Sequence, residues 1–365
     1  MRILYGVVGE GMGHALRSRV VLDELTREHQ VQVVVSGRAH DYLKARESDR
    51  LGVTRIWGLT MVYEDNEVRN FRTVLENVRG AVTGGLPKNV KAYFEVATRF
   101  DPEVVVSDFE TWSYLFAKSR GLPVISIDNQ QIINRCTHRP EILAGHEADF
   151  RLARAVVKAK LPGCFHYLVT TFFYPSVSKP RTSLHPPVLR SEILAARPEP
   201  GDHLLVYQTS ASYARLLEVL RRSGVECRVY GVRRGIREEQ VEGNLRFRPF
   251  SEAGFVEDLR RARGVLSNGG FTLMGEAVSL HKPMLSVPVK KQFEQVLNAR
   301  YLDSLGYGMA ADEVTPAVLG RFLERLPELS RSVAAYRQDG NRELLGTLAE
   351  RLAAARGQPP SAGEE

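Results

Sequence analysis

The chain has 365 residues, of which 43% are hydrophobic and 25% are charged, a composition typical of a soluble globular protein. This length is enough for two domains of ordinary size, each with its own core. No apolar run reaches the roughly 18 residues that span a bilayer, which argues against an integral membrane protein. The net charge of +7 comes without a basic cluster interleaved with aromatic residues, so nucleic-acid binding is not expected.

Short apolar runs alternate with helical patterns in the first half of the chain. Strands are expected at RILYGVV, VQVVVSG, EVVVSDF and PVISIDN, with helices at about 14–28 and 111–120. Continuous β-branched runs separated by helices indicate a parallel sheet covered on both faces. Residues 1–180 are therefore predicted to form a Rossmann-like domain. Because ligands bind beyond the carboxyl ends of such strands, the loops at 9–14, 36–38, 108–110 and 128–131 should line one cleft.

The sequence GEGMGH follows the first predicted strand directly. Its glycines, Gly9, Gly11 and Gly13, allow a sharp turn and the close approach of another molecule to the main chain, and Glu10 lies between them. His14 then falls in the first turn of a helix, where the positive end of the helix dipole favours the neutral imidazole that a base needs.

A dinucleotide-binding fingerprint does not fit this loop. The pattern GxGxxG requires its third glycine at position 14, which is histidine here, and the second strand ends in VVVSGR without an acidic residue for a ribose 2′-hydroxyl. The sequence thus argues against a dehydrogenase.

A Pro- and Ser-rich stretch at 174–202 lacks periodicity and indicates the interdomain linker, which we place at 181–202. A second alternation follows, with strands at HLLVYQT, CRVYGV, LRFRPF, GVLSNGG and PMLSVPV and helices near 211–223, 252–262, 271–280 and 292–305. It predicts a second Rossmann-like domain over 203–356, whose last helix can pack back on the N-terminal domain. The polar tail 357–365 is expected to be disordered.

Residues 267–308, SNGGFTLMGEAVSLHKPMLSVPVKKQFEQVLNARYLDSLGYG, are the most specific stretch of the chain. They resemble the donor-binding signature of the UDP-sugar glycosyltransferases of the GT-B fold, which include plant-type glucosyltransferases and the bacterial enzyme that completes lipid II. The matching positions are Gly269, Gly270, Glu276, the HKP at 281–283, Pro288, Glu294, Gln295, Asn298 and Ala299. The resemblance extends to the GEGMGH loop and implies two Rossmann-like domains that face each other across a cleft.

The resemblance also implies roles for several of the matching residues. Backbone N–H groups after Gly270, at Phe271 and Thr272, would hold a pyrophosphate at the start of a helix. The family's usual His or Arg at this turn is Asn268 here, so phosphate contacts are assigned mainly to the backbone. Glu276 would accept hydrogen bonds from ribose hydroxyls.

The two polar residues of the second half of the signature, Glu294 and Gln295, would bind sugar hydroxyls. The carboxylate of Glu294 can only accept hydrogen bonds, whereas the amide of Gln295 supplies both a donor and an acceptor.

His14 has an expected partner in Asp108, 94 residues later, because the plant-type relatives pair a histidine base with an aspartate at a similar interval. The aspartate would fix the imidazole tautomer and stabilise the imidazolium. Two alternatives remain open: His14 could cap a helix or contact the donor phosphate, and Glu10 or Glu110 could be the base.

A catalytic metal is not expected, since DFE at 108–110 has no supporting carboxylate cluster. The segments 61–71 and 83–89 are predicted to form an acceptor lid. The stretch 149–160 is a basic amphipathic helix, which is either an ordinary surface helix or one that rests on an anionic membrane.

These observations predict an inverting, metal-independent glycosyltransferase that uses a nucleotide sugar, with UDP favoured, and a hydroxyl acceptor such as a lipid, glycan or small molecule. No cofactor is expected beside that co-substrate. The alternatives are a nucleotide-sugar 2-epimerase and a non-catalytic binding protein. The three scattered cysteines argue for buried thiols, and the chain enters a strand directly, so we expect a cytoplasmic protein.

Overall fold

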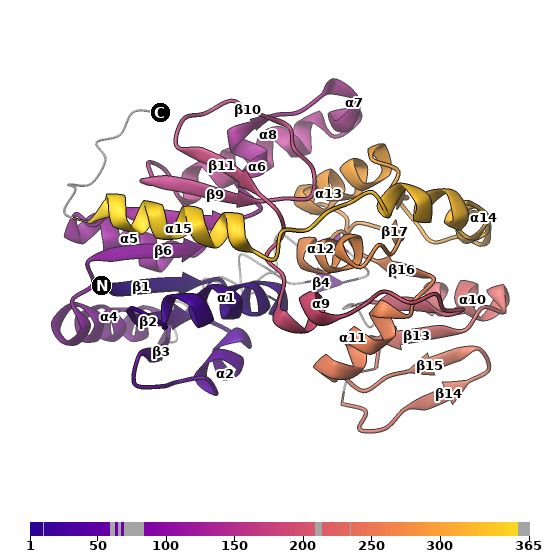
Figure 1. Cartoon of the computed structure of the whole chain (residues 1–365), viewed down its shortest axis with the longest axis horizontal. Coiled ribbons are helices and arrows are strands. Elements are labelled where there is room, and N and C mark those ends of the chain that lie inside the picture. Colours follow the sequence, from indigo (N-terminus) through magenta and orange to yellow (C-terminus); the bar gives the residue numbers. More distant parts are fainter. Residues whose placement is uncertain are drawn as a thin grey trace.

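The computed structural model describes residues 1–9, 11–58, 63–64, 67–68, 84–208, 214–233 and 235–356, and all structural statements concern these residues. They form two α/β domains, each built on a seven-stranded sheet (Figure 1). The expected fold class is confirmed.

The N-terminal sheet has the strand order β11-β9-β7-β6-β1-β2-β3, and every neighbouring pair is parallel. Successive residues of β1 alternate between two cores, with Ile3 and Tyr5 on one face of the sheet and Leu4 on the other. Both faces are therefore covered, as the continuous apolar strands require. The strands are β1 (Arg2–Val7), β2 (Gln30–Val35), β3 (Leu51–Arg55), β6 (Val104–Asp108), β7 (Val124–Asp128), β9 (His166–Thr170) and β11 (Thr182–His185).

Helices and two small strand pairs complete this domain. The helices are α1 (Met12–Leu25), α2 (Ala39–Lys44), α4 (Leu86–Glu95) with the π-helical turn η2 (Val96–Phe100), α5 (Thr111–Arg120), α6 (Ile132–Arg135), α7 (Pro140–Leu143) and α8 (Glu147–Lys160). The pairs are β4 (Tyr63–Glu64) with β5 (Glu67–Val68), and β8 (Cys136–Thr137) with β10 (Ser176–Val177). Part of the predicted lid lies outside the described residues. Of it, the structure describes β4, β5 and residues 84–89, where α4 begins.

The predicted linker begins too early. Residues 182–185, which the sequence analysis assigned to the linker, form β11 and pair in parallel with β9 at one edge of the N-terminal sheet. The sequence TSLH has no run of β-branched residues, and β11 as an edge strand has only one pairing partner, so it was missed. Strand β9, HYLVT, was not predicted either. The linker follows β11 and contains the short helix α9 (Ser191–Ala195).

The C-terminal sheet has the order β14-β15-β13-β12-β16-β17-β18, in which only the edge pair β14–β15 is antiparallel among the pairs described. Its strands are β12 (Leu204–Tyr207), β13 (Cys227–Tyr230), β14 (Gln240–Glu242), β15 (Leu245–Phe247), β16 (Gly264–Ser267), β17 (Met284–Ser286) and β18 (Gly308–Ala310). Its helices are α10 (Ala214–Ser223), α11 (Glu252–Arg260), α12 (Phe271–Ser279), α13 (Phe293–Ser304) and α14 (Pro316–Val333).

The last helix, α15 (Arg342–Ala355), crosses back to the N-terminal domain, alongside which it lies in Figure 1. Its Leu344, Leu348 and Leu352 belong to the same core as Ile3 and Tyr5. The tail 357–365, predicted to be disordered, lies outside the described residues.

The two chain crossings between the domains are hydrogen-bonded to each other, at Leu189 and Asn341 and also at Pro187 and Gln338. Leu189 donates its N–H to Asn341 Oδ1 at 2.9 Å, and Asn341 Nδ2 donates to the carbonyl of Leu189 at 2.7 Å. Linker and return crossing are thus joined by a buried amide.

The strand order reverses between β1 and β6 in the first sheet and between β12 and β16 in the second. Ligands of open α/β sheets bind beyond the carboxyl ends of the strands at such points. Helices α1 and α12, which follow β1 and β16, contact each other across the domain interface.

Two further sequence expectations concern the membrane and the cysteines. In the described part of the chain, no helix is long and apolar enough to span a membrane. Cys136, Cys164 and Cys227 are buried free thiols, as expected.

Candidate active site

The glycine loop packs too closely for side chains at two of its positions. A Cβ at Gly9 would lie 2.0 Å from the carbonyl oxygen of Ser36, and one at Gly13 would lie 2.7 Å from Thr272 Oγ1 on α12. Gly11 has a φ of 85°, which L residues rarely adopt, and serves as the N-cap of α1. The glycines thus bring the start of α1 against the donor helix predicted in the other domain. Glu10 lies outside the described residues.

The structure brings His14 and Asp108 together. His14 is in the first turn of α1 and Asp108 ends β6, and His14 Nδ1 lies 2.8 Å from Asp108 Oδ1. The carboxylate of Asp108 can only accept a hydrogen bond, which favours a proton on Nδ1. Arg17 Nη2 lies 3.0 Å from the same nitrogen and can only donate, which favours the other tautomer. With the proton on Nδ1, the lone pair on Nε2 is available to a substrate hydroxyl.

Two residues that the sequence analysis missed complete the surroundings of Asp108. Arg17 donates from Nε to Oδ2 at 3.1 Å and from Nη2 to Oδ1, and Ser18 Oγ donates to Oδ2 at 3.0 Å. Burial opposes ionisation of Asp108, but the charges of Arg17 and His14 outweigh it and lower the pKa of Asp108 to about 2. The available signal was the helical spacing, since Arg17 lies three residues after His14 on the same side of α1.

The loop after β7 provides the polar groups next to His14. Gln130 Nε2 lies 3.5 Å from His14 Nε2, and Asn129 Nδ2 donates to Glu294 Oε1 of α13 at 3.0 Å. Asp128 accepts hydrogen bonds from Ser126 Oγ and the N–H of Gln131, but burial dominates and raises the pKa of Asp128 to about 6. This predicted cleft loop therefore joins the base candidate to the C-terminal domain.

Glu110, one of the rival bases, is a helix cap. Its carboxylate accepts the N–H groups of Trp112 at 2.7 Å and Ser113 at 2.6 Å at the start of α5, and only 6% of the residue is exposed. A capping carboxylate held by two N–H groups points into the fold. The geometry therefore favours His14 over Glu110.

The predicted phosphate-binding turn lies at the start of α12. Asn268 directly follows β16, and the N-cap is Gly270, which has no side chain to cap this helix end. Phe271 offers its backbone only, because its ring stacks on Phe172 of the N-terminal domain, with ring centroids 6.0 Å apart. Thr272 faces Gly13. Uncapped first-turn N–H groups of a helix form a site for an anion.

Gln295 has a different placement from the one expected for a sugar ligand. Its Oε1 accepts the N–H of Gly269 at 3.1 Å and that of Val289 at 2.9 Å, and its Nε2 donates to Gln292 Oε1. Asn298 supports the same turn by donating to the carbonyl of Gly269 at 3.1 Å. Both lone pairs of the Gln295 amide oxygen are used, so Gln295 shapes the glycine turn.

Glu276 is likewise bound within the protein. Its Oε1 accepts Arg190 Nε at 2.8 Å and its Oε2 accepts Arg190 Nη2 at 3.1 Å, with both side chains buried. Arg190 comes from the linker, and no role was predicted for it from the sequence. The ribose-binding role of Glu276 stays a prediction. If Glu276 binds ribose, it does so while it is paired with Arg190.

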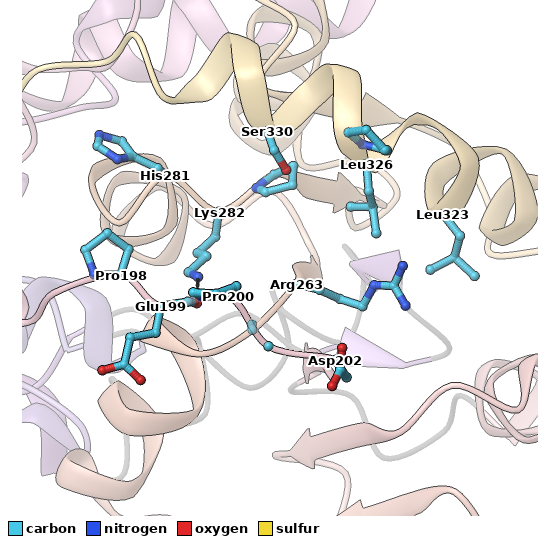
Figure 2. Close-up of a pocket in the computed structure, with 14 residues that line it drawn as sticks. Pro198, Glu199, Pro200, Asp202, Arg263, His281, Lys282, Leu323, Leu326 and Ser330 are labelled. Atoms are coloured by element: carbon cyan, nitrogen blue, oxygen red, sulfur yellow. Dashed lines mark hydrogen bonds between the residues drawn. The ribbon is translucent and has the colours of Figure 1, made fainter.

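A separate hollow of about 510 Å³ lies on the linker side of the C-terminal domain (Figure 2). Lys282 points across it and donates to the carbonyl of Glu199 at 2.8 Å, and burial lowers the pKa of Lys282 to about 8. Of the signature positions, the HKP at 281–283 lines this hollow, while none of the residues predicted to bind the donor or to act as the base does. In the described ranges, no three His, Cys, Asp or Glu side chains are grouped so as to hold a metal ion.

The structure has the GT-B architecture, in which two α/β domains face each other. The N-terminal domain provides the His–Asp pair, and the C-terminal domain provides the uncapped helix start. Residues 1–327 match the model of glycosyl transferase family 1, and the chain belongs to this family. A relative from Methanosarcina acetivorans, described as an uncharacterized glycosyltransferase, is 24% identical over 338 residues, which cover 86% of this chain and 84% of the relative.

Solved structures show the same fold at low sequence identity. CalG4, the calicheamicin glycosyltransferase, is similar with a TM-score of 0.64 and 16% identity, covering 98% of this chain and 99% of that one. MurG of Acinetobacter baumannii is similar with a TM-score of 0.60 and 13% identity, covering 96% and 100%. The protein is a glycosyltransferase, and its site can be interpreted in those terms.

Proposed function

We propose that the protein transfers a sugar from a UDP-sugar to a hydroxyl group of an acceptor and inverts the anomeric centre. One observation carries the proposal: the His14–Asp108 pair adjoins the uncapped start of α12, because Gly13, next to His14, packs against Thr272. A base and a pyrophosphate site are thereby neighbours. These are the two parts that a single displacement needs.

The proposed reaction is one in-line step. The acceptor oxygen attacks the anomeric carbon and gives its proton to His14 Nε2. The bond from that carbon to the phosphate oxygen breaks, and its electron pair leaves with the nucleoside diphosphate. Attack on the face opposite the leaving group inverts the configuration. Asp108 stabilises the imidazolium that forms, and the first turn of α12 stabilises the negative charge on the leaving group.

We propose further that this step needs no metal ion, because the helix start and Thr272 take the role of balancing phosphate charge. Turnover should then be largely intact in EDTA. Complete loss of turnover that Mg²⁺ or Mn²⁺ restores would contradict this part of the proposal.

A thermal-shift panel of UDP, GDP, dTDP and their sugars tests the donor. A ligand that binds only the folded state at 100 times its Kd stabilises that state by about 2.7 kcal/mol, so UDP and its sugars should raise the Tm most. Incubation with UDP-GlcNAc without acceptor then separates transfer from epimerisation. Formation of a 2-epimer would favour the epimerase alternative.

The acceptor side of the proposal includes peripheral contact with an anionic membrane through α8. Leu152 and Val156 lie four residues apart, so they share a face of the helix, and they are 67% and 56% exposed. The exposed Arg151, Arg154 and Lys158 flank them. An apolar face with flanking basic residues suits anionic headgroups. The contact would bring a lipid-borne hydroxyl near the site, at the cytoplasmic face that the sequence predicts.

Vesicle co-sedimentation tests this contact. The protein should bind vesicles that contain an anionic lipid more than zwitterionic ones, and the double variant L152S/V156S should lose this binding. Leu305→Ser, at another exposed apolar residue, is the matched control and should bind normally. Equal binding by all three proteins would favour the ordinary surface helix.

A further inference from the structure

Arg190, which belongs to the linker, binds the carboxylate of Glu276 on α12 of the C-terminal domain. Its guanidinium forms the two-pronged contact with Glu276, and each residue is only 4% exposed. The preceding residue, Leu189, is where the linker is tied to Asn341. Arg190 is therefore anchored on a fixed part of the chain, between the two domains.

Stability alone is a weak reason for such a pair. Removing two charges from water costs about as much as their attraction returns, and apolar replacements are often no less stable. The geometry, in contrast, leaves the carboxylate able to bind a ligand. Each oxygen has two acceptor positions, and the arginine fork uses one of each. Burial raises the pKa of Glu276, and Arg190 opposes that rise.

The position of Glu276 on α12 connects it to the phosphate site. Glu276 lies four residues after Thr272, so the two side chains share a face of the helix, and Thr272 is the residue that contacts Gly13 at the helix start. One helical turn is about 5.4 Å, so Glu276 lies about one turn beyond the residue that marks the helix start.

We propose that Arg190 is a positioning residue for the donor: it keeps Glu276 ionised and oriented so that the carboxylate accepts hydrogen bonds from the ribose hydroxyls. This inference rests on the proposed function. It assigns to the interdomain linker a part in recognising the sugar of the nucleoside.

A chain of ion pairs holds the arginine itself in place. Arg190 Nη1 lies 3.7 Å from Glu252 Oε2 on α11, and the same oxygen lies 3.2 Å from Arg19 Nη1 on α1. Arg19 also pairs with Glu192 of α9 at 2.5 Å. Residues from both domains and from the linker thus fix the orientation of the Arg190 guanidinium. A surface arginine without such partners would not have a fixed orientation.

Calorimetry with UDP and 2′-deoxy-UDP tests the proposal on Arg190→Lys, which keeps the charge but removes the fork. A hydrogen bond to a charged group contributes about 1.5–3 kcal/mol, so the wild-type protein should prefer UDP by about tenfold or more. Arg190→Lys should reduce this preference to about threefold or less, with weaker UDP binding. Arg190→Gln, which keeps one donor, serves if the lysine variant does not fold.

Arg228→Lys is the matched control, because Arg228 pairs with the buried Asp258 at 2.5 Å within the C-terminal domain. It should lower the Tm and leave the preference for UDP unchanged. A purely structural Arg190 would behave in the same way, and that result overturns the inference. Equal wild-type affinity for the two nucleotides also overturns it, while wild-type protein that binds no nucleoside diphosphate overturns the proposed function itself.

Discussion

The imidazole of His14 is held by Asp108 through Nδ1, while Nε2 lies beside Gln130. If Nε2 takes the acceptor proton, His14→Ala should lower kcat by roughly 10²–10⁴, the usual contribution of a general base. Donor affinity, measured by calorimetry on the same variant, should stay nearly unchanged. An equal loss of both quantities would instead identify His14 as a phosphate ligand.

Asp108 has a second task, which makes Asp108→Asn a test of stability as well as of rate. Loss of its charge leaves the buried Arg17 without a full partner, and breaking a buried pair costs about 3–5 kcal/mol. Urea unfolding at pH 7 should show this loss. The rate should also fall, although less than in His14→Ala, and must be compared on folded protein.

The lowered pKa of Asp108 fixes the pH range of its contribution to stability. Because the pKa is about 2 in the folded protein and about 3.9 in the unfolded chain, the contribution is fully present above about pH 4 and is lost as the pH falls through 2. The stability difference between wild type and Asp108→Asn should accordingly narrow between pH 4 and 2. A constant difference would contradict the pairing.

Glu276→Ala should weaken UDP binding by about 1.5–3 kcal/mol, the contribution of a hydrogen bond to a charged group. It also strands Arg190, so the Tm should fall. Glu276→Gln, which keeps an acceptor, should bind UDP with intermediate affinity. Unchanged calorimetric affinity in folded Glu276→Ala would refute the assignment to ribose.

In the turn before α12, the two neighbouring glycines are expected to have different roles: Gly269 is needed for packing, and Gly270 for phosphate binding. A Cβ at Gly269 would lie 2.4 Å from the carbonyl oxygen of Gln295, so Gly269→Ala should destabilise the protein by about 1–3 kcal/mol. A Cβ at Gly270 would meet nothing described within 4 Å, and its φ of −65° suits alanine.

Gly270→Ala should therefore keep the wild-type Tm and yet bind UDP more weakly, because the added methyl group lies where the phosphate approaches the helix start. Thermal denaturation and calorimetry on both variants distinguish the two roles. Normal UDP affinity in Gly270→Ala would place the phosphate elsewhere.

The sequence predicts the elements around this turn well and their side-chain partners less well. The helices over 111–120 and 271–280 agree with α5 and α12 to within a residue, because apolar spacing and glycine punctuation are local signals. Gln295 and Glu276 were expected to face a ligand, but their bonds run to Gly269 and Arg190. Arg190 lies 86 residues from Glu276, and no local pattern encodes such a pairing.

In the whole molecule, the order of the chain does not follow the division into domains, because the last helix packs on the first domain. Alternating strands and helices predicted two Rossmann-like domains, and the structure has them. The helical pattern of α15 cannot tell which domain it covers, since an apolar face fits any apolar surface. After the hydrogen bonds between Asn341 and Leu189, the chain returns to the N-terminal sheet.

The return of α15 to the N-terminal domain leads to a prediction about local stability. Leu348 is 1% exposed and belongs to the N-terminal core, while Leu326 of α14 is 5% exposed and belongs to the C-terminal core. Either substitution to alanine should cost about 2–5 kcal/mol. In hydrogen exchange, Leu348→Ala should reduce protection in β1 and β2, although residue 348 follows the whole C-terminal sheet. Leu326→Ala should reduce it in β12 and β16. The same exchange pattern in both variants would show that the domains unfold as one unit.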